Sequence, residues 1–280
     1  MKLLKTRVAS ALIAVIILIA VVCSGQIILG ISVFLVSILA MHEYFKSLEN
    51  AGYKPVRAVG YVACASILLL CCERVSKILC LEQLVSLEAL IFAVFIMIVV
   101  LFSFIIFLHG KYNIVDISLT FFGVFYITFL LSFIVLIRNL NNGFFFVWLI
   151  FIGAFSTDTF AYFSGRFFGK HKLMPAISPK KTVEGSIGGV IGCALTTMLY
   201  GLYLNKSGSI DFIPYYHFLL IGVLCGIISQ MGDWAASAIK RYVKVKDFGN
   251  IMPGHGGALD RFDSILFTAP AVYFYLSWII

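Results

Sequence analysis

The sequence predicts an all-α fold, a polytopic transmembrane helix bundle of about nine spans, and three observations support this prediction. Of the 280 residues, 61% are hydrophobic and only 12% are charged, whereas soluble domains carry about 25% charged residues. Mean hydropathy is +1.04, and the apolar residues gather in runs near the roughly 20 residues that a spanning helix needs. The basic residues gather in alternate connections between these runs. This composition excludes a soluble globular domain, a disordered chain and a disulfide-rich scaffold.

The apolar runs give the predicted spans in order along the chain. They are residues 8–24, 26–45, 57–72, 88–108, 116–137, 144–163, 184–204, 217–238 and 264–280. The first run follows three cations, as in a cleavable signal peptide, but the bulky Val22 lies where such peptides need a small residue. We therefore interpret this run as a span. We expect an N-terminal transmembrane region at 1–140 and a C-terminal transmembrane region at 141–280.

The distribution of Lys and Arg predicts the orientation. With the N-terminus in the cytoplasm, 17 of the 21 basic residues lie on the cytoplasmic side, as the positive-inside rule favours. The other four are Arg74, Lys77, Arg138 and Lys206. An odd number of spans then puts the C-terminus outside. The net charge of +8 is explained by this asymmetry, and we expect no nucleic-acid partner.

The first region contains no motif that names a reaction. His42 and Glu43 come near the end of the second predicted span, and we interpret them as a helix terminus that reaches water. The seven cysteines lie mostly inside apolar runs and show no CxxC or Cys/His spacing. We therefore interpret them as small hydrophobic side chains rather than metal or redox ligands.

The second region concentrates acidic residues beside glycines and cations on the predicted cytoplasmic side. A carboxylate near a bilayer is costly and is usually paired, metal-bound or exposed to a water-filled cavity. Carboxylates beside many Lys and Arg residues suggest a metal ion together with phosphate. The six residues concerned are Asp158, Glu184, Asp233, Asp247, Asp260 and Asp263.

One motif lies at the inner end of the sixth predicted span, and a second follows it. The first, DTFAYFSGRFFGK, places Asp158, Tyr162, Gly165, Arg166 and Gly169 on one helical stripe; the alternative is a simple packing stripe with a basic flank. The second, SPKKTVEGSIGG, combines a proline turn, two cations and a helix start. A helix N-terminus with adjacent cations favours anions, and the order of residues is not that of a Walker motif.

The second motif also allows other interpretations. The stretch could be an ordinary positive-inside loop in which Glu184 interacts with the helix dipole. Its glycines, spaced along the helix that follows, predict a helix-packing face. They are Gly185, Gly188, Gly189 and Gly192.

Of two further motifs, one lies at the inner end of the eighth predicted span and the other is the loop that leads into the last span. In GDWAASAIKR a helix would align Asp233, Ser237, Lys240, Arg241 and Lys244 on one face. The loop KDFGNIMPGHGGALDRFDS has glycines around His255, which allow close approach to a ligand, and ends with Asp260 and Asp263 on one predicted helix face. The acids of these two motifs offer hard oxygens without thiolate, as Mg²⁺ prefers. Alternatively, the loop acids could simply pair with Arg261 and Lys246.

Together these stretches resemble the phosphatidate cytidylyltransferase family, also called CDP-diacylglycerol synthases, in its bacterial integral-membrane form. The resemblance covers roughly residues 150–265 and is carried by SxxKRxxxxKD and PGHGGxLDRxD. The matching residues are Ser237, Lys240, Arg241, Lys246, Asp247, Gly249, Pro253, His255, Gly256, Gly257, Asp260, Arg261 and Asp263. One departure is Ala236, where the family is expected to have an acid.

The resemblance implies that CTP and phosphatidate react to give CDP-diacylglycerol and diphosphate, with Mg²⁺ as the cofactor. Membrane lipid is implied as a further partner. It places the enzyme in a bacterial plasma membrane, with its active site in the second region at the cytoplasmic face. A homodimer is one of the assemblies that the sequence allows. By resemblance, Asp233, Asp260 and Asp263 are catalytic and hold the metal, and Lys240 and Arg241 are catalytic phosphate ligands. The implied substrate-binding residues are Ser178, Lys180, Lys181, Ser237, Lys246, Asp247, His255, Gly256, Gly257 and Arg261.

Two other functions fit parts of this pattern. A CTP-dependent lipid kinase would use similar metal and cation chemistry but would transfer the γ-phosphoryl group. An anion transporter would place polar groups near mid-membrane and in both halves, whereas here they cluster at one face of the second region. We therefore expect the cytidylyltransferase reaction.

Overall fold

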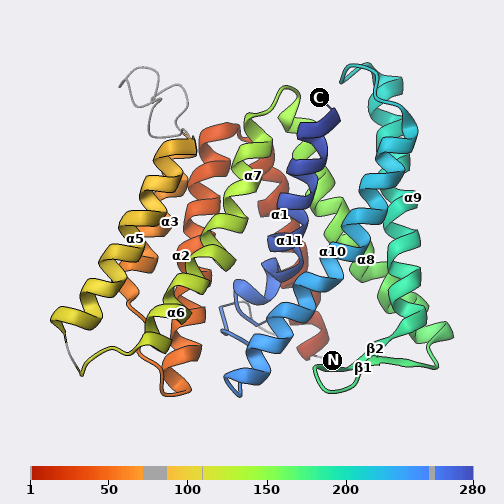
Figure 1. Ribbon diagram of the computed structural model, residues 1–280. Coiled ribbons are helices and arrows are strands. Elements are labelled where there is room, and N and C mark those ends of the chain that lie inside the picture. Colours follow the sequence, from red (N-terminus) through yellow and green to blue (C-terminus); the bar gives the residue numbers. More distant parts are fainter. Residues whose placement is uncertain (1, 72–86, 109, 252–255, 280) are drawn as a thin grey trace. The chain divides into compact units, whose positions relative to one another are not determined.

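The computed structural model describes residues 2–71, 87–108, 110–251 and 256–279. Within the described residues the chain is mostly helical (Figure 1). It forms two compact units, one of Met1–Val135 with Val243–Leu259 and one of Leu136–Tyr242 with Asp260–Ile280. The division into sequence regions 1–140 and 141–280 stays a prediction.

The first unit is built from helices α1 (Lys2–Cys23), α2 (Gln26–Asn50), α3 (Arg57–Cys71), α5 (Leu87–Phe107) and α6 (Ile114–Gly123). A π-helical turn, η2 (Val124–Phe129), joins α6 to α7 (Leu130–Asn139), and α7 belongs to this unit as far as Val135. Its core centres on α2, where Met41, Tyr44 and Phe45 are at most 1% exposed. Gly60 of α3 faces the ring of Phe45, and Gly123 of α6 faces the ring of Tyr44. These small residues allow the helices to approach closely around large side chains.

The connection between α2 and α3 is fixed to the start of α6 by hydrogen bonds. Asp116 is 2% exposed, and its carboxylate accepts from the backbone N–H groups of Lys54 (2.7 Å) and Asn113 (3.0 Å). Asn113 in turn caps α6 by accepting from the N–H group of Asp116 at 2.9 Å. Because buried charge needs such partners, this capping box also determines where the loop lies.

The second unit is built from α8 (Gly143–Phe168), α9 (Val183–Ser207), α10 (Tyr215–Tyr242) and α11 (Leu259–Ile279), apart from the first residue of α11, Leu259, which belongs to the first unit. Between α8 and α9 a short antiparallel hairpin pairs β1 (Lys172–Met174) with β2 (Ser178–Thr182), with Lys172 opposite Thr182. The all-α prediction did not include this hairpin. Pro179 lacks an N–H group, which is tolerated because each strand of a two-stranded sheet has a free edge.

Glycines lie where α8 and α9 pack side by side (Figure 1). A Cβ atom on Gly185 would lie 2.8 Å from the carbonyl oxygen of Ala161 and 3.1 Å from the Cα atom of Gly165. A Cβ atom on Gly189 would lie 3.1 Å from the Cβ atom of Ala161. Such distances leave little room for a side chain, so the predicted glycine packing face of this helix is confirmed.

In the part of the chain that the structure describes, each predicted span coincides with helical residues. Seven helical segments are long and apolar enough to cross a membrane, and the shorter apolar helices Ser10–Cys23 and Arg57–Leu70 account for the other two predicted segments. The chain is therefore a multi-pass membrane protein, while the count of about nine and the orientation stay predictions. The seven candidate spans are Gln26–Asn50, Glu88–Phe107, Ile114–Asn139, Gly143–Phe168, Val183–Ser207, Tyr215–Tyr242 and Leu259–Ile279.

Candidate active site

A lysine from the hairpin and an aspartate from α10 form the first contact of the site. Strand side chains alternate between faces, so Lys180 is exposed while Lys181 is half-buried. The ammonium group of Lys181 donates to Oδ2 of Asp233, and it lies 5.6 Å from the ring centre of Trp234. Adjacent lysines that look equivalent in the sequence thus have different environments.

The predicted stripe on α10 is confirmed for Asp233, Ser237 and Lys240. Ser237, one turn after Asp233, donates to its Oδ1 atom at 3.4 Å, so both carboxylate oxygens have partners. Lys240 continues the same face. The inclusion of Lys244 was wrong, because α10 ends at Tyr242 and Lys244 has a left-handed backbone with φ of 57°.

A buried ion pair joins α10 to α11. The ammonium group of Lys240 donates to Oδ1 of Asp260 at 2.8 Å, and the two side chains are 11% and 3% exposed. The sequence had suggested Arg261 or Lys246 as the alternative partner for the loop acids. Removing one member of a buried pair leaves the other charge uncompensated, so this pair fixes the relation between the two helices.

Close backbone contact brings a third carboxylate into the same region. A Cβ atom on Gly232 would lie 2.5 Å from the carbonyl oxygen of Asp263, so α10 and α11 touch there. The Oδ1 atom of Asp263 accepts from the N–H group of Ser264 at 2.7 Å. The carboxylates of Asp158, Asp233 and Asp263 interact electrostatically with one another, as Asp158 does with Lys181 and Arg261. The site is therefore a cluster of carboxylates and cations.

The donor set of this cluster fits a hard divalent cation. Its carboxylates interact, and oxygen ligands are those that Mg²⁺ prefers. In the described part of the chain, however, no three or more His, Cys, Asp or Glu side chains converge as a metal-binding group. Lys181 and Lys240 each take one carboxylate oxygen instead. The assignment of Asp233, Asp260 and Asp263 as Mg²⁺ ligands stays a prediction, with which their oxygen atoms are compatible.

The start of α9, expected to attract anions, is capped by the protein itself. The hydroxyl oxygen of Thr182 accepts from the N–H group of Gly185 at 3.2 Å. Glu184 accepts from the N–H group of Lys170 at 3.1 Å and contacts Nδ1 of His171 at 2.6 Å. Glu184 thus stabilises the hairpin rather than joining the carboxylate cluster.

The remaining predicted residues lie in several places. Ser178 and Lys180 are on β2, and the exposed Arg241 has its Nε atom 3.5 Å from the carbonyl oxygen of Ile177, beside the same hairpin. Lys246, Asp247, Gly256 and Gly257 belong to the first unit, and His255 lies outside the described residues. Ala236, where an acid was expected, is fully buried within α10.

One important residue was missed by the sequence analysis. Glu43 is 3% exposed, and its carboxylate accepts from the N–H groups of Ala258 at 3.0 Å and Leu259 at 2.9 Å. A Cβ atom on Gly249 or Gly257 would overlap this carboxylate. The interpretation of Glu43 as a helix terminus in water was wrong, because α2 continues to Asn50. The available signal was a charge inside an apolar run.

The fold and the site define a class, a multi-pass membrane protein with a polar site of carboxylates and lysines set among its helices. The chain belongs to the cytidylyltransferase family, whose model matches residues 5–279. It is 30% identical over 275 residues to the phosphatidate cytidylyltransferase of Bacillus subtilis, covering 98% of each chain. It is 32% identical over 268 residues to the phosphatidate cytidylyltransferase of Staphylococcus saprophyticus, covering 95% of this chain and 96% of the relative.

Proposed function

We propose that this protein is a phosphatidate cytidylyltransferase, which transfers the cytidylyl group of CTP to phosphatidate and releases diphosphate. The relatives of this name match nearly its full length. The observation that carries the proposal is the arrangement of Lys181 with Asp233 and Lys240 with Asp260, beside Asp263. Alternating carboxylates and cations suit a reaction between two phosphate-bearing substrates.

The chemistry needs charge neutralisation more than it needs a base. The phosphomonoester of phosphatidate has a second pKa of about 6, so it is largely ionised at neutral pH. One of its oxygens attacks the α-phosphorus of CTP, and the bond from that phosphorus to the bridging oxygen of the diphosphate breaks. The protein must bring two anions together, align them and stabilise the departing diphosphate.

The lysines of the site are suited to this task. Mg²⁺ held by Asp233, Asp260 and Asp263 would supply further positive charge near the phosphates. Lys181 and Lys240 are paired with carboxylates without substrate, and we propose that both turn toward phosphate oxygens when substrate binds. Buried, preorganised cations are most effective where charge develops in the transition state.

The proposal places the active site at the cytoplasmic face of a bacterial plasma membrane. The basis is the distribution of Lys and Arg, of which 17 of 21 lie on one predicted side. The nucleotide substrate is available in that compartment, whereas phosphatidate is available from the bilayer.

The test uses purified protein with phosphatidate, Mg²⁺ and CTP labelled either at the α- or at the γ-phosphate. We expect α-label in the lipid, γ-label in released diphosphate, and no product from Asp233→Asn. Transfer of γ-label to the lipid would instead indicate a CTP-dependent lipid kinase. Uptake of anions into sealed vesicles without lipid labelling would indicate a transporter.

A further inference from the structure

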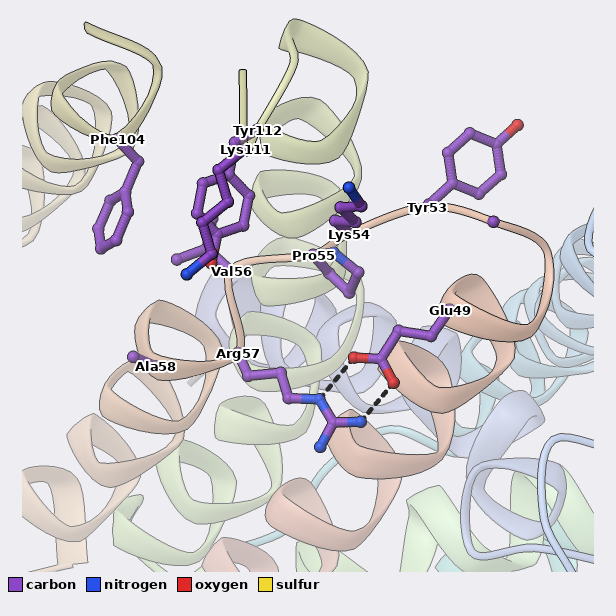
Figure 2. A pocket seen from close by; sticks show the side chains of 11 residues that line it. Glu49, Tyr53, Lys54, Pro55, Val56, Arg57, Ala58, Phe104, Lys111 and Tyr112 are labelled. Carbon is purple, nitrogen blue, oxygen red and sulfur yellow. Dashed lines mark hydrogen bonds and ion pairs between the residues drawn. The ribbon is translucent and has the colours of Figure 1, made fainter. Parts of the chain in front are cut away.

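A separate cleft lies wholly within the first unit, where the connection from α2 to α3 meets the end of α5 and the start of α6. Its volume is about 630 Å³. Figure 2 shows the side chains that line it, among them the cations Lys54, Arg57 and Lys111 and the rings of Phe104 and Tyr112. Neither the carboxylate cluster nor any predicted site residue contributes to this cleft.

The side chains that line the cleft carry a net positive charge. Arg57 is neutralised by Glu49, since its Nε atom donates to Oε1 at 2.7 Å and its Nη2 atom to Oε2 (Figure 2). Lys54 and Lys111 are exposed, and in the described part of the chain neither ammonium group has a carboxylate within 4.0 Å. The nearby Asp116 is buried and already accepts backbone hydrogen bonds. Two cations are thus available to an anionic ligand.

The other walls of the cleft are apolar, and one of them belongs to the apolar helix α5. Phe104 and Tyr112 pack edge to face with ring centres 5.7 Å apart. Phe104 belongs to α5, whose spanning part has a hydropathy of 3.3 and only 6% buried residues. Beyond the cleft, Ile106 and Phe107 are 67% and 81% exposed. Such a helix is expected to contact acyl chains rather than water.

We propose that this cleft binds an anionic phospholipid of the bilayer, with its phosphate near Lys54 and Lys111 and its acyl chains along α5. A free phosphate ion would leave the aromatic wall unused, whereas a phospholipid complements both the cations and the apolar surface. Basic residues at a membrane surface attract anionic lipids by about 1 kcal/mol each. This corresponds to about fivefold in affinity for each lysine. The inference does not depend on the proposed reaction.

The test measures retention of phosphatidylglycerol by the full-length protein in detergent, using native mass spectrometry over a lipid titration. Phosphatidylglycerol is chosen because it is not a substrate of the proposed reaction. We expect the Lys54→Gln/Lys111→Gln variant to bind it roughly 25-fold more weakly, from about fivefold for each lysine. The matched control is Lys46→Gln, an exposed lysine of α2 that does not line the cleft, and it should bind like the unmodified protein.

Two further arms identify the source of the ligand. Phosphatidylcholine should bind weakly and equally to all variants, and glycerol 3-phosphate should not compete with phosphatidylglycerol. A photoreactive acyl chain on phosphatidylglycerol should label peptides of α5. Equal phosphatidylglycerol binding by the double variant and the unmodified protein, effective competition by glycerol 3-phosphate, or labelling confined to other helices would each overturn the proposal.

Discussion

The carboxylate of Glu43 lies 2.9 Å from the backbone nitrogen of Leu259, which is 216 residues away in the sequence. The same carboxylate accepts from Ala258 at 3.0 Å. Leu259 is the first residue of α11, and the first N–H groups of a helix have no partner within it. Glu43 therefore caps α11 from another helix, with a negative charge at the positive end of the helix dipole.

We expect Glu43→Gln to destabilise the protein and to lower its activity. The amide keeps one acceptor oxygen but turns an NH₂ group toward a backbone N–H group, and an unsatisfied buried donor costs about 1–3 kcal/mol. Activity should fall because α11 also carries Asp260 and Asp263. Thermal unfolding in detergent and steady-state turnover measure the two effects.

The matched control is Glu49→Gln, six residues further along α2, where the carboxylate is 36% exposed and pairs with Arg57. Exposed pairs contribute about 0–1 kcal/mol, so this change should leave unfolding nearly unaltered. Equal stability of the Glu43 and Glu49 variants would contradict the capping role.

A second prediction concerns the buried pair of Lys240 and Asp260. Each single change, Lys240→Met or Asp260→Asn, should destabilise the protein by about 3–5 kcal/mol, because one buried charge is left uncompensated. The double variant should recover most of this stability, yet it should remain inactive if both groups act on the substrates. Thermal unfolding combined with activity measures the separation. Recovery of activity in the double variant would show that the pair is only structural.

A third prediction separates the two lysines of β2. Lys180→Ala should mainly raise the KM for CTP, because Lys180 is exposed. A cation remote from the reacting atoms stabilises bound substrate and transition state equally, so its loss changes KM more than kcat. Lys181→Ala should also lower kcat, by about 10²-fold or more, because Lys181 contacts Asp233 in the cluster. Steady-state kinetics at saturating Mg²⁺ and varied CTP compares them. Indistinguishable kinetics for the two variants would remove the distinction.

A fourth prediction tests orientation. In a background lacking all seven native cysteines, single cysteines at Ser178 and Asn250 should react with an impermeant thiol reagent only from the cytoplasmic side. Inverted and right-side-out vesicles give the two accessibilities. Labelling of either position from outside would contradict the predicted topology.

The apolar runs predicted the helices well, because long hydrophobic segments determine their own secondary structure in a membrane. The glycine face of α9 was predictable for a similar local reason, namely the spacing of Gly185 and Gly189. The grouping of Asp233 with Ser237 and Lys240 also followed from helical periodicity. Each of these inferences needs information from only one helix.

Inferences that depend on distant partners failed or could not be made. The burial of Glu43 depends on its contact with Leu259. The ion-pair partner of Asp260 is Lys240, rather than Arg261 or Lys246, because of how α10 and α11 pack. The hairpin of β1 and β2 gives Lys180 and Lys181 different environments, and its short strands carry no long periodic signal. Tertiary contacts, rather than local pattern, decide these features.

The π-helical turn Val124–Phe129 decides how the segment from Ile114 to Asn139 responds to a change in its length. A π-turn closes its hydrogen bond one residue later than an α-turn, so it accommodates one extra residue in the helix. Deleting one residue there would restore an uninterrupted α-helix and leave the later side chains facing nearly as they do now, whereas a second deletion would rotate every later side chain by about 100°. After a second deletion Leu131 and Ile134, now at most 1% exposed, would leave the core, so this segment tolerates the loss of one residue but not of two.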